Sequence, residues 1–171
     1  ARRTNTHFEV IAASARTANL PEGFDNAVLS RDPIYVATHP DVEVVVELMG
    51  GLEAARAAIL AAIGAGKSVV TANKAVIAKY GTEILAAAEA ANVRVLFEAA
   101  AAGGIPIMKV LRDGLAGNQI QSLAGIINGT CNYILTEMTE KGSPFGQVLA
   151  DAQAKGYAEA DPSSDVGGGD A

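Results

Sequence analysis

Short apolar runs alternate with longer alanine-rich stretches along the first part of the chain, and this alternation limits the possible folds more than any other feature of the sequence. Four runs have the length and the β-branched content of strands: 8–13, 42–48, 68–71 and 93–97. Three stretches between them are too long and too rich in alanine for strands and are expected to be helices: 52–65, 75–80 and 81–91. Strands and helices in alternation form βαβ units around a mainly parallel sheet. We therefore expect residues 1–97 to belong to a doubly wound α/β domain.

The pattern changes after residue 97. A helix that opens near Pro106 is expected at 105–115, a strand at 120–127, and two further helices at 130–141 and 144–155. The last helix carries signals at both ends, with Ser143 to cap it, Pro144 at its first position and Gly156 to end it in the left-handed conformation. Residues 157–171 show no periodicity and are expected to form an acidic loop.

The composition excludes several classes of protein. With a net charge of -6 at pH 7, the chain lacks the basic face of a protein that binds nucleic acid. No apolar run approaches the roughly 18–20 residues that span a bilayer, so no membrane partner is expected. Its single cysteine, Cys131, and its two histidines cannot form an internal disulfide or a Cys/His zinc cluster. We expect a cytoplasmic protein with a core of small and β-branched aliphatic residues, because aromatics make up only 5% of the chain.

Two connections follow strands of the expected sheet and carry candidate ligand-binding residues. Ligands of open α/β sheets bind beyond the carboxyl ends of the strands. Gly50 and Gly51 would let a dinucleotide approach the backbone there, and Lys74 would bring a cation near a phosphate, a carboxylate or the reacting oxygen. The alternative is that the glycine pair is only a turn and that Lys74 is an exposed residue at the start of a helix.

The cofactor preference depends on the end of the first strand. No Gly-x-Gly-x-x-Gly follows a strand before Val42, so the first strand and the phosphate loop of a dinucleotide-binding fold would lie upstream of Ala1. The run 8–13 would then be the second strand, whose end meets the adenosine ribose. An acid at that point selects NAD, whereas an arginine accommodates the 2′-phosphate of NADP. Because Arg16 is present and an acid is not, we expect NADP, with NAD as the alternative.

The second part of the chain holds three further candidates. Glu98 precedes a run of small residues whose carbonyls, together with its carboxylate, can hold a hard cation or the nicotinamide, unless the run is a flexible hinge. Thr130 is expected to cap a helix whose N-terminus also suits a substrate carboxylate. Tyr157 and the acids after it can bind an ammonium group or orient a hydroxyl, unless this tail is merely solvated. Cys131 is expected to fill space.

Five strings, in chain order and over almost the whole sequence, resemble homoserine dehydrogenase. They are Val-Glu-Leu-Met-Gly-Gly (46–51), Val-Thr-Ala-Asn-Lys (70–74), Phe-Glu-Ala-Ala-Ala-Ala-Gly-Gly-Ile-Pro (97–106), Asn-Gly-Thr-Cys-Asn-Tyr-Ile-Leu (128–135) and Gly-Tyr-Ala-Glu-Ala-Asp-Pro (156–162). The resemblance implies a partial Rossmann-type domain over residues 1–97, followed by an α+β catalytic and dimerisation domain over 98–171. It also implies the interconversion of L-homoserine and L-aspartate 4-semialdehyde with NAD(P), for the synthesis of threonine, methionine and isoleucine, by a homodimer or a larger oligomer.

The resemblance also implies roles for individual residues. Lys74 would lie close to the nicotinamide and the substrate hydroxyl. The residues that the resemblance places at the cofactor are Gly50, Lys74 and Gly156, to which the strand ends considered above add Arg16 and Gly51. Those expected at the substrate are Thr130, Tyr157, Glu159, Asp165 and Asp170, of which Glu159 would bind the amino group and Asp165 and Asp170 would serve catalysis with Lys74. Those expected around a monovalent cation such as sodium are Glu98, Ala101, Gly103 and Ile105.

Some features of the family are not found in these 171 residues. They lack the glycine-rich phosphate loop and the lysine, four residues after the position of Asp170, that exchanges the proton, and Gly167 stands where an acid is common. We therefore expect the chain to be an inner part of the enzyme and to be inactive by itself. The alternative is a non-catalytic ligand-binding or dimerisation fragment with the same fold.

Overall fold

The structure, a computed structural model of the chain, describes residues 7–15, 24, 27–158 and 160–168. It divides into two compact units, Ala1–Ala116 and Gly117–Ala171, and each is considered by itself. In the part of the chain so described, no helix is long and apolar enough to cross a membrane.

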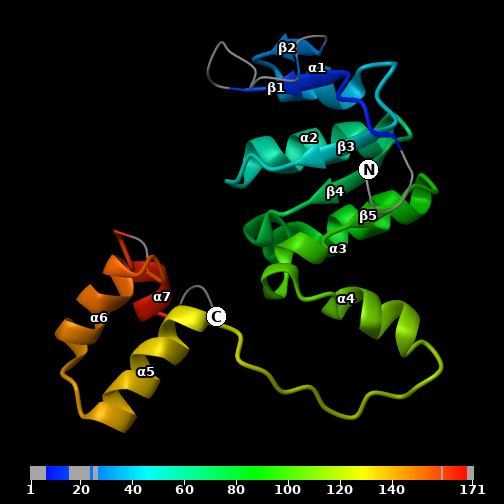
Figure 1. Cartoon of the computed structure of the whole chain (residues 1–171). Coiled ribbons are helices and arrows are strands. Elements are labelled where there is room, and N and C mark those ends of the chain that lie inside the picture. Colours follow the sequence, from blue (N-terminus) through cyan, green and yellow to red (C-terminus); the bar gives the residue numbers. More distant parts are fainter. Residues whose placement is uncertain (1–6, 16–23, 25–26, 159, 169–171) are drawn as a thin grey trace. The chain divides into compact units, whose positions relative to one another are not determined.

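The first unit contains two parallel sheets (Figure 1). One sheet pairs β1 (Ala12–Ser14) with β2 (Val28–Ser30). In the other sheet β4 (Ser68–Thr71) lies between β3 (Val44–Glu47) and β5 (Val95–Leu96). All of these described pairings are parallel, which confirms the α/β class expected from the alternation of strands and helices.

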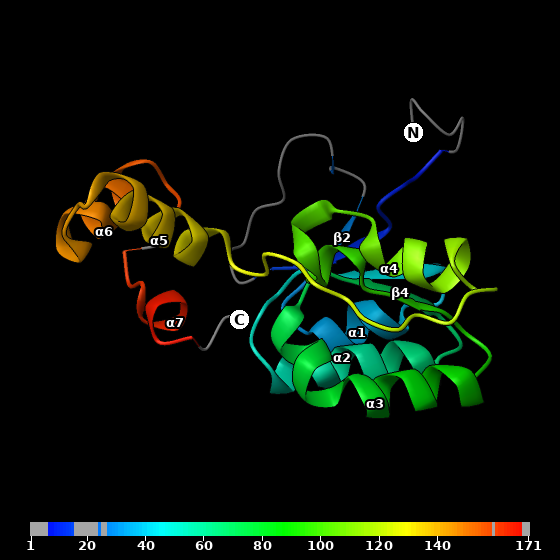
Figure 2. The same ribbon diagram turned by 90° about the horizontal axis from the view of Figure 1, so that it is seen from below.

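Three helices lie on one side of these strands, and a shorter helical segment lies on the other (Figure 2). The three are α1 (Pro33–Thr38), α2 (Glu53–Gly64) and α3 (Lys74–Ala90). The shorter segment runs from α4 (Ile107–Lys109) into a π-helical turn, η3 (Val110–Gly114), and follows two single turns, η1 (Glu98–Ala100) and η2 (Ala102–Gly104). Small and branched aliphatic side chains fill the space between α2, α3 and the strands, and Ile59, Val69, Val76 and Ile84 are fully buried there.

The first unit departs from the sequence prediction at three places. The expected strand 8–13 is observed as the shorter strand β1, which begins at Ala12 and ends at Ser14, so only the last two residues of the prediction lie in it. β2 and α1 were not predicted, because three residues and six residues are too few to show a period. The two predicted helices 75–80 and 81–91 form the single helix α3, whose interior accommodates Gly81 at a cost of about 1 kcal/mol relative to alanine.

The second unit contains helices and no strand among its described residues. It comprises α5 (Gly129–Lys141), α6 (Phe145–Ala154) and α7 (Ser163–Val166). Packing of α5 against α6 buries Ile134, Val148 and Ala152. The predicted Ser143 cap is wrong, because α6 has no side-chain cap and Pro144 occupies the position before its first residue. Gly156 has a φ of 74°, which confirms the left-handed residue expected after this helix.

The predicted strand 120–127 is wrong. The structure has no strand there, and the apolar side chains of this segment are exposed, with Leu123 at 69% and Ile127 at 78%. The apolar residues are those of a strand, but a strand also needs a neighbour to accept its backbone hydrogen bonds. No described strand pairs with this segment. The prediction that residues 157–171 form only a loop is also wrong, because the helix α7 lies within them.

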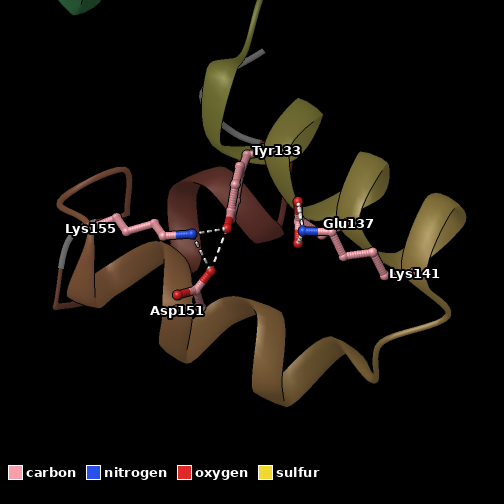
Figure 3. A network of polar contacts seen from close by, with 5 residues as sticks. All are labelled: Tyr133, Glu137, Lys141, Asp151 and Lys155. Carbon is pink, nitrogen blue, oxygen red and sulfur yellow. Dashed lines mark hydrogen bonds and ion pairs between the residues drawn. The ribbon is translucent and has the colours of Figure 1, made fainter.

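A cluster of three polar side chains joins α5 to α6 (Figure 3). The Lys155 ammonium donates to the Asp151 carboxylate at 2.8 Å and to the Tyr133 hydroxyl at 2.7 Å, and the Tyr133 hydroxyl donates to Asp151. Lys155, and after it Tyr133, hold the pKa of Asp151 below its usual range. The hydrogen bond to Asp151 is the main cause that raises the pKa of Tyr133, and it is also the main cause that raises the pKa of Lys155. The cluster therefore favours the charged form of Asp151 in the folded unit.

The lowered pKa of Asp151 makes its contribution to stability depend on pH. The folded unit binds this proton less tightly than the unfolded chain, so the contribution is complete above the ordinary value of 3.8 and is lost as the pH falls through the lowered folded pKa. Asp151→Asn should therefore reduce stability near neutral pH, and this loss should shrink under acid. Urea unfolding of the intact protein from about pH 7 to about pH 3 measures the difference. Lys155→Met should flatten the pH dependence in the same way; a loss that is the same at every pH would contradict the assignment.

Candidate functional site

The carboxyl ends of β3 and β4 lie at the same level, because the register pairs Glu47 with Thr71. The connection after β3 contains Gly50 and Gly51, each with a φ of 71°. These left-handed values explain the glycine pair, since other residues adopt them only with strain. A Cβ atom added to either glycine would have no neighbour within 4 Å. The backbone is thus open on this side. The glycine pair can therefore form the turn and also let a ligand approach the backbone.

The connection after β4 leads directly into α3 and places Lys74 at the first residue of that helix. The Asn73 side chain caps the helix by accepting a hydrogen bond from the Val76 amide at 3.2 Å. Its Nδ2 also donates to the Gly51 carbonyl oxygen at 2.9 Å. The two connections are therefore tied together, and Lys74 and the Gly50–Gly51 turn belong to one local structure. Lys74 is exposed, as its position at a helix start predicts.

The segment after β5 gives Glu98 a structural role that the sequence did not indicate. Its carboxylate accepts hydrogen bonds from the Met108 and Lys109 amides at 2.9 and 3.0 Å, so it holds the start of α4 and is not the solvated residue of a hinge. The backbone turns tightly through Gly103 and Gly104, with φ of 56° and 97°. Ile105 accepts one hydrogen bond at its carbonyl oxygen, from the Ile107 amide at 2.7 Å.

The donor set of this segment is compatible with a hard cation. Each carboxylate oxygen of Glu98 keeps a second lone pair after its backbone bond, as does the Ile105 carbonyl oxygen. Oxygen ligands from carboxylate and backbone are those that hard cations take. Ala101 and Gly103 supply further carbonyl groups within the same turns. In the described residues, no group of three or more His, Cys, Asp and Glu side chains is placed to hold a metal ion.

In the second unit, four polar residues meet around the start of α5. The Thr130 hydroxyl donates to the Tyr157 carbonyl oxygen at 2.6 Å. Asn128 caps the helix by accepting from the Cys131 amide at 2.7 Å, and its Nδ2 donates to Asp165 at 2.9 Å. The prediction that Thr130 is the cap is therefore wrong; it lies within the first turn and is buried. Thr130, Tyr157 and Asp165 are nevertheless brought together, as the predicted substrate group requires.

The surroundings of this group are polar and partly open. The Tyr157 side chain is 56% exposed and its ring packs edge-on against Tyr133 at 5.0 Å. Cys131 donates from its thiol to the Asp165 carbonyl oxygen at 3.1 Å, which gives it a defined structural contact in place of a mere space-filling role. The Ser163 hydroxyl and then its amide lower the pKa of Asp161. Arg16, Glu159 and Asp170 lie outside the described residues, so their predicted roles stay predictions.

Sequence reasoning missed three residues that organise these places: Glu47, Asn73 and Asn128. All three stand in the strings that carry the resemblance, but their residue types alone do not show which neighbour they bind. The sequence did hold a signal for the two asparagines. Each stands just before a predicted helix, where asparagine is a favoured cap. Glu47 had none, because a glutamate at the end of a strand is usually solvated.

Two family models match the chain one after the other. The model described as "Homoserine dehydrogenase, NAD binding domain" matches residues 2–98, and the model described as "Homoserine dehydrogenase" matches residues 106–171. Among curated relatives, homoserine dehydrogenase of Neisseria gonorrhoeae is 59% identical over 146 residues, which are 85% of this chain and 34% of the relative. That of Synechocystis is 58% identical over 166 residues, 96% of this chain and 38% of the relative. The chain thus spans a little over a third of the length of these relatives.

Solved structures give the same result. The crystal structure of a homoserine dehydrogenase from Thiobacillus denitrificans is 54% identical and superposes with a TM-score of 0.82, over 91% of this chain and 36% of that one. A hyperthermophilic archaeal homoserine dehydrogenase in complex with NADPH is 32% identical, with a TM-score of 0.73 over 81% of this chain and 43% of that one. These likenesses confirm the Rossmann-type α/β fold.

The contact between Asn128 and Asp165 generates a prediction. Asn128→Asp keeps the acceptor that caps α5 but removes the donor to Asp165 and sets two carboxylates against each other. Hydrogen bonds to charged groups contribute about 1.5–3 kcal/mol, so amide exchange in α7 should accelerate about tenfold or more. Hydrogen exchange of the Val166 and Gly167 amides measures this effect.

Asn132→Asp is the matched control, because Asn132 is an exposed asparagine on the same helix. It should leave exchange in α7 unchanged. Equal acceleration by both substitutions would attribute the effect to added charge and would remove the specific role of Asn128.

Proposed function

This chain belongs to the homoserine dehydrogenase family, and from that premise we propose that the intact protein interconverts L-homoserine and L-aspartate 4-semialdehyde with a nicotinamide cofactor. The observation that carries the proposal is the match of both family models, in order, over residues 2–98 and 106–171. The geometry supports it, since polar and glycine residues gather beyond the carboxyl ends of parallel strands, where dinucleotides bind.

In the first unit we assign Gly50, Gly51 and Lys74 to the cofactor. The open left-handed turn gives a dinucleotide access to the backbone, and Lys74 stands beside it at the start of α3. The bound cofactor supplies the acceptor and donor of hydride. The Lys74 ammonium would stabilise negative charge on the substrate oxygen as its hydroxyl proton leaves. Arg16 would favour NADP over NAD, and Gly156 completes the predicted cofactor set.

In the second unit we assign Thr130, Tyr157, Glu159, Asp165 and Asp170 to the substrate. Thr130 and Asp165 are held in place by the contacts to Tyr157 and Asn128, so their polar atoms are ordered before a substrate arrives. A carboxylate such as Glu159 can bind the ammonium group of homoserine, and Asp165 and Asp170 can orient its hydroxyl or the lysine that takes the proton.

Further parts of the proposal follow from the resemblance. Glu98, Ala101, Gly103 and Ile105 would hold a monovalent cation such as sodium, which their oxygen donors suit. Residues 1–97 would bind the nucleotide and 98–171 would contribute to catalysis and dimerisation. The enzyme would act as a cytoplasmic homodimer or larger oligomer in the synthesis of threonine, methionine and isoleucine.

The proposal predicts homoserine-dependent reduction of NADP by the intact protein, with a higher kcat/KM for NADP than for NAD, because Arg16 offers a cation to the 2′-phosphate and no acid is present to bind the ribose. Initial rates followed by NADPH absorbance, with each cofactor varied at saturating homoserine, measure both. Absence of turnover would refute the proposed reaction. A tenfold preference for NAD would refute only the assignment of Arg16.

A second prediction concerns Glu159. Glu159→Gln should raise KM for homoserine by roughly 10–150-fold, since a charge-assisted hydrogen bond contributes about 1.5–3 kcal/mol. KM for the cofactor should change little. Glu140→Gln, at an exposed position of α5, is the matched control and should behave as wild type. An unaltered homoserine KM in Glu159→Gln would exclude this residue from the substrate site.

A further inference from the structure

The buried face of β3 and β4 ends in two polar side chains. Along this face Val45 and Val69 are buried and apolar, as expected where helices cover a sheet. Glu47 and Thr71 lie two residues further along their strands and therefore on the same face. They are also buried, with 3% and 0% of their surfaces exposed. They face each other across the pairing. A carboxyl group in this position loses its hydration and therefore requires hydrogen bonds from the protein.

The Glu47 carboxylate receives these bonds from both connections at once. One oxygen accepts from the Met49 amide at 2.7 Å, within the connection after β3. The other accepts from the Thr71 hydroxyl at 2.6 Å, at the end of β4. The Thr71 hydroxyl oxygen in turn accepts from the Asn73 amide at 3.0 Å. Glu47 therefore fixes the start of the glycine turn and, through Thr71, the residue that caps α3.

The bonds of Glu47 and of Asn73 form two ties between the same connections. The first joins Met49 to Asn73 through Glu47 and Thr71; the second is the direct bond from Asn73 to the Gly51 carbonyl oxygen. Two ties restrict both the separation and the rotation of the segments that they join. Two apolar residues could fill the same buried space, and replacing a buried charged or polar pair by apolar residues is often neutral or stabilising for the fold. The polar pair is thus better explained by the geometry that it imposes than by stability.

We propose that Glu47 is a positioning residue for the dinucleotide: it holds the Gly50–Gly51 turn and the start of α3, with Lys74, in the arrangement that the cofactor requires. This inference rests on the proposed function in one respect, that the ligand at these connections is a dinucleotide. Glu47 acts through Met49 and Thr71. Removal of its bonds should weaken cofactor binding more than it weakens homoserine binding.

The experiment uses the intact protein with substitutions at both ends of the tie. Glu47→Gln retains the size of the side chain but removes its charge and replaces one acceptor oxygen by a donor, so the bond with the Thr71 hydroxyl must reverse or break and the other bond loses its charge assistance. Thr71→Val retains the shape and removes the hydroxyl. Thr71→Ser keeps the hydroxyl and tests rescue. Glu43→Gln, an exposed glutamate just before β3, makes the same change of charge without touching the tie.

Three measurements are made on each variant: NADPH affinity by fluorescence titration, kinetics with cofactor and homoserine varied separately, and hydrogen exchange of residues 48–52. We expect Glu47→Gln and Thr71→Val to raise the Kd and KM of the cofactor about tenfold, which corresponds to the loss of one interaction. Homoserine KM should stay within about twofold of wild type. Exchange at Met49 should accelerate in both variants, whereas Thr71→Ser and Glu43→Gln should resemble wild type.

Two results would overturn the inference. One is wild-type NADPH affinity in Glu47→Gln and Thr71→Val. The other is an equal loss in cofactor binding, homoserine KM and kcat that follows the fraction of unfolded protein by circular dichroism, because a merely structural role predicts that pattern. If the wild-type protein does not oxidise homoserine, the proposed function fails, while the NADPH titration still decides the role of Glu47. If NADPH does not bind the wild-type protein, the inference fails as well.

Discussion

The parallel pairing of β3 with β4 is the constraint on which the first unit depends. Its register sets Glu47 against Thr71, so the two strands end at one level and their connections leave the sheet side by side. Because side chains alternate along a strand, the same register buries Val45 and exposes Val46. A shift of one residue would exchange these faces and would also separate Glu47 from Thr71. The register therefore determines the core and the candidate cofactor site together.

The core and the site are stabilised by different interactions. Burial of aliphatic side chains such as Ile59 and Ile84, each contributing roughly 1.5–3 kcal/mol, supplies most of the favourable free energy of the first unit. The hydrogen bonds of Glu47 mainly offset the cost of removing a carboxyl group from water, so their net contribution is small. Apolar contacts are not directional, whereas these bonds are. The arrangement of the connections is thus set by interactions that contribute little to stability.

Features governed by neighbouring residues could be predicted from the sequence, and features governed by distant ones could not. Strand β4 and the left-handed Gly156 depend on local composition and on one backbone conformation, and both are observed as expected. The segment 120–127 has the composition of a strand, yet strand formation also requires a partner that no local pattern reveals. The grouping of Thr130 with Tyr157 and Asp165 could be expected only from resemblance to a known family, because 27 residues or more separate Thr130 from the other two.

Both candidate sites are organised by an asparagine with the same double role. Asn73 caps α3 through its Oδ1 and donates from Nδ2 to Gly51; Asn128 caps α5 through its Oδ1 and donates from Nδ2 to Asp165. Serine, threonine and aspartate also cap helices, but among favoured caps only asparagine offers a carbonyl acceptor and an amide donor in one planar group. The helix fixes the orientation of this group by using its acceptor, and the donor then points at a neighbouring segment. A capping asparagine thus links the start of a regular helix to an irregular connection that carries a candidate functional residue.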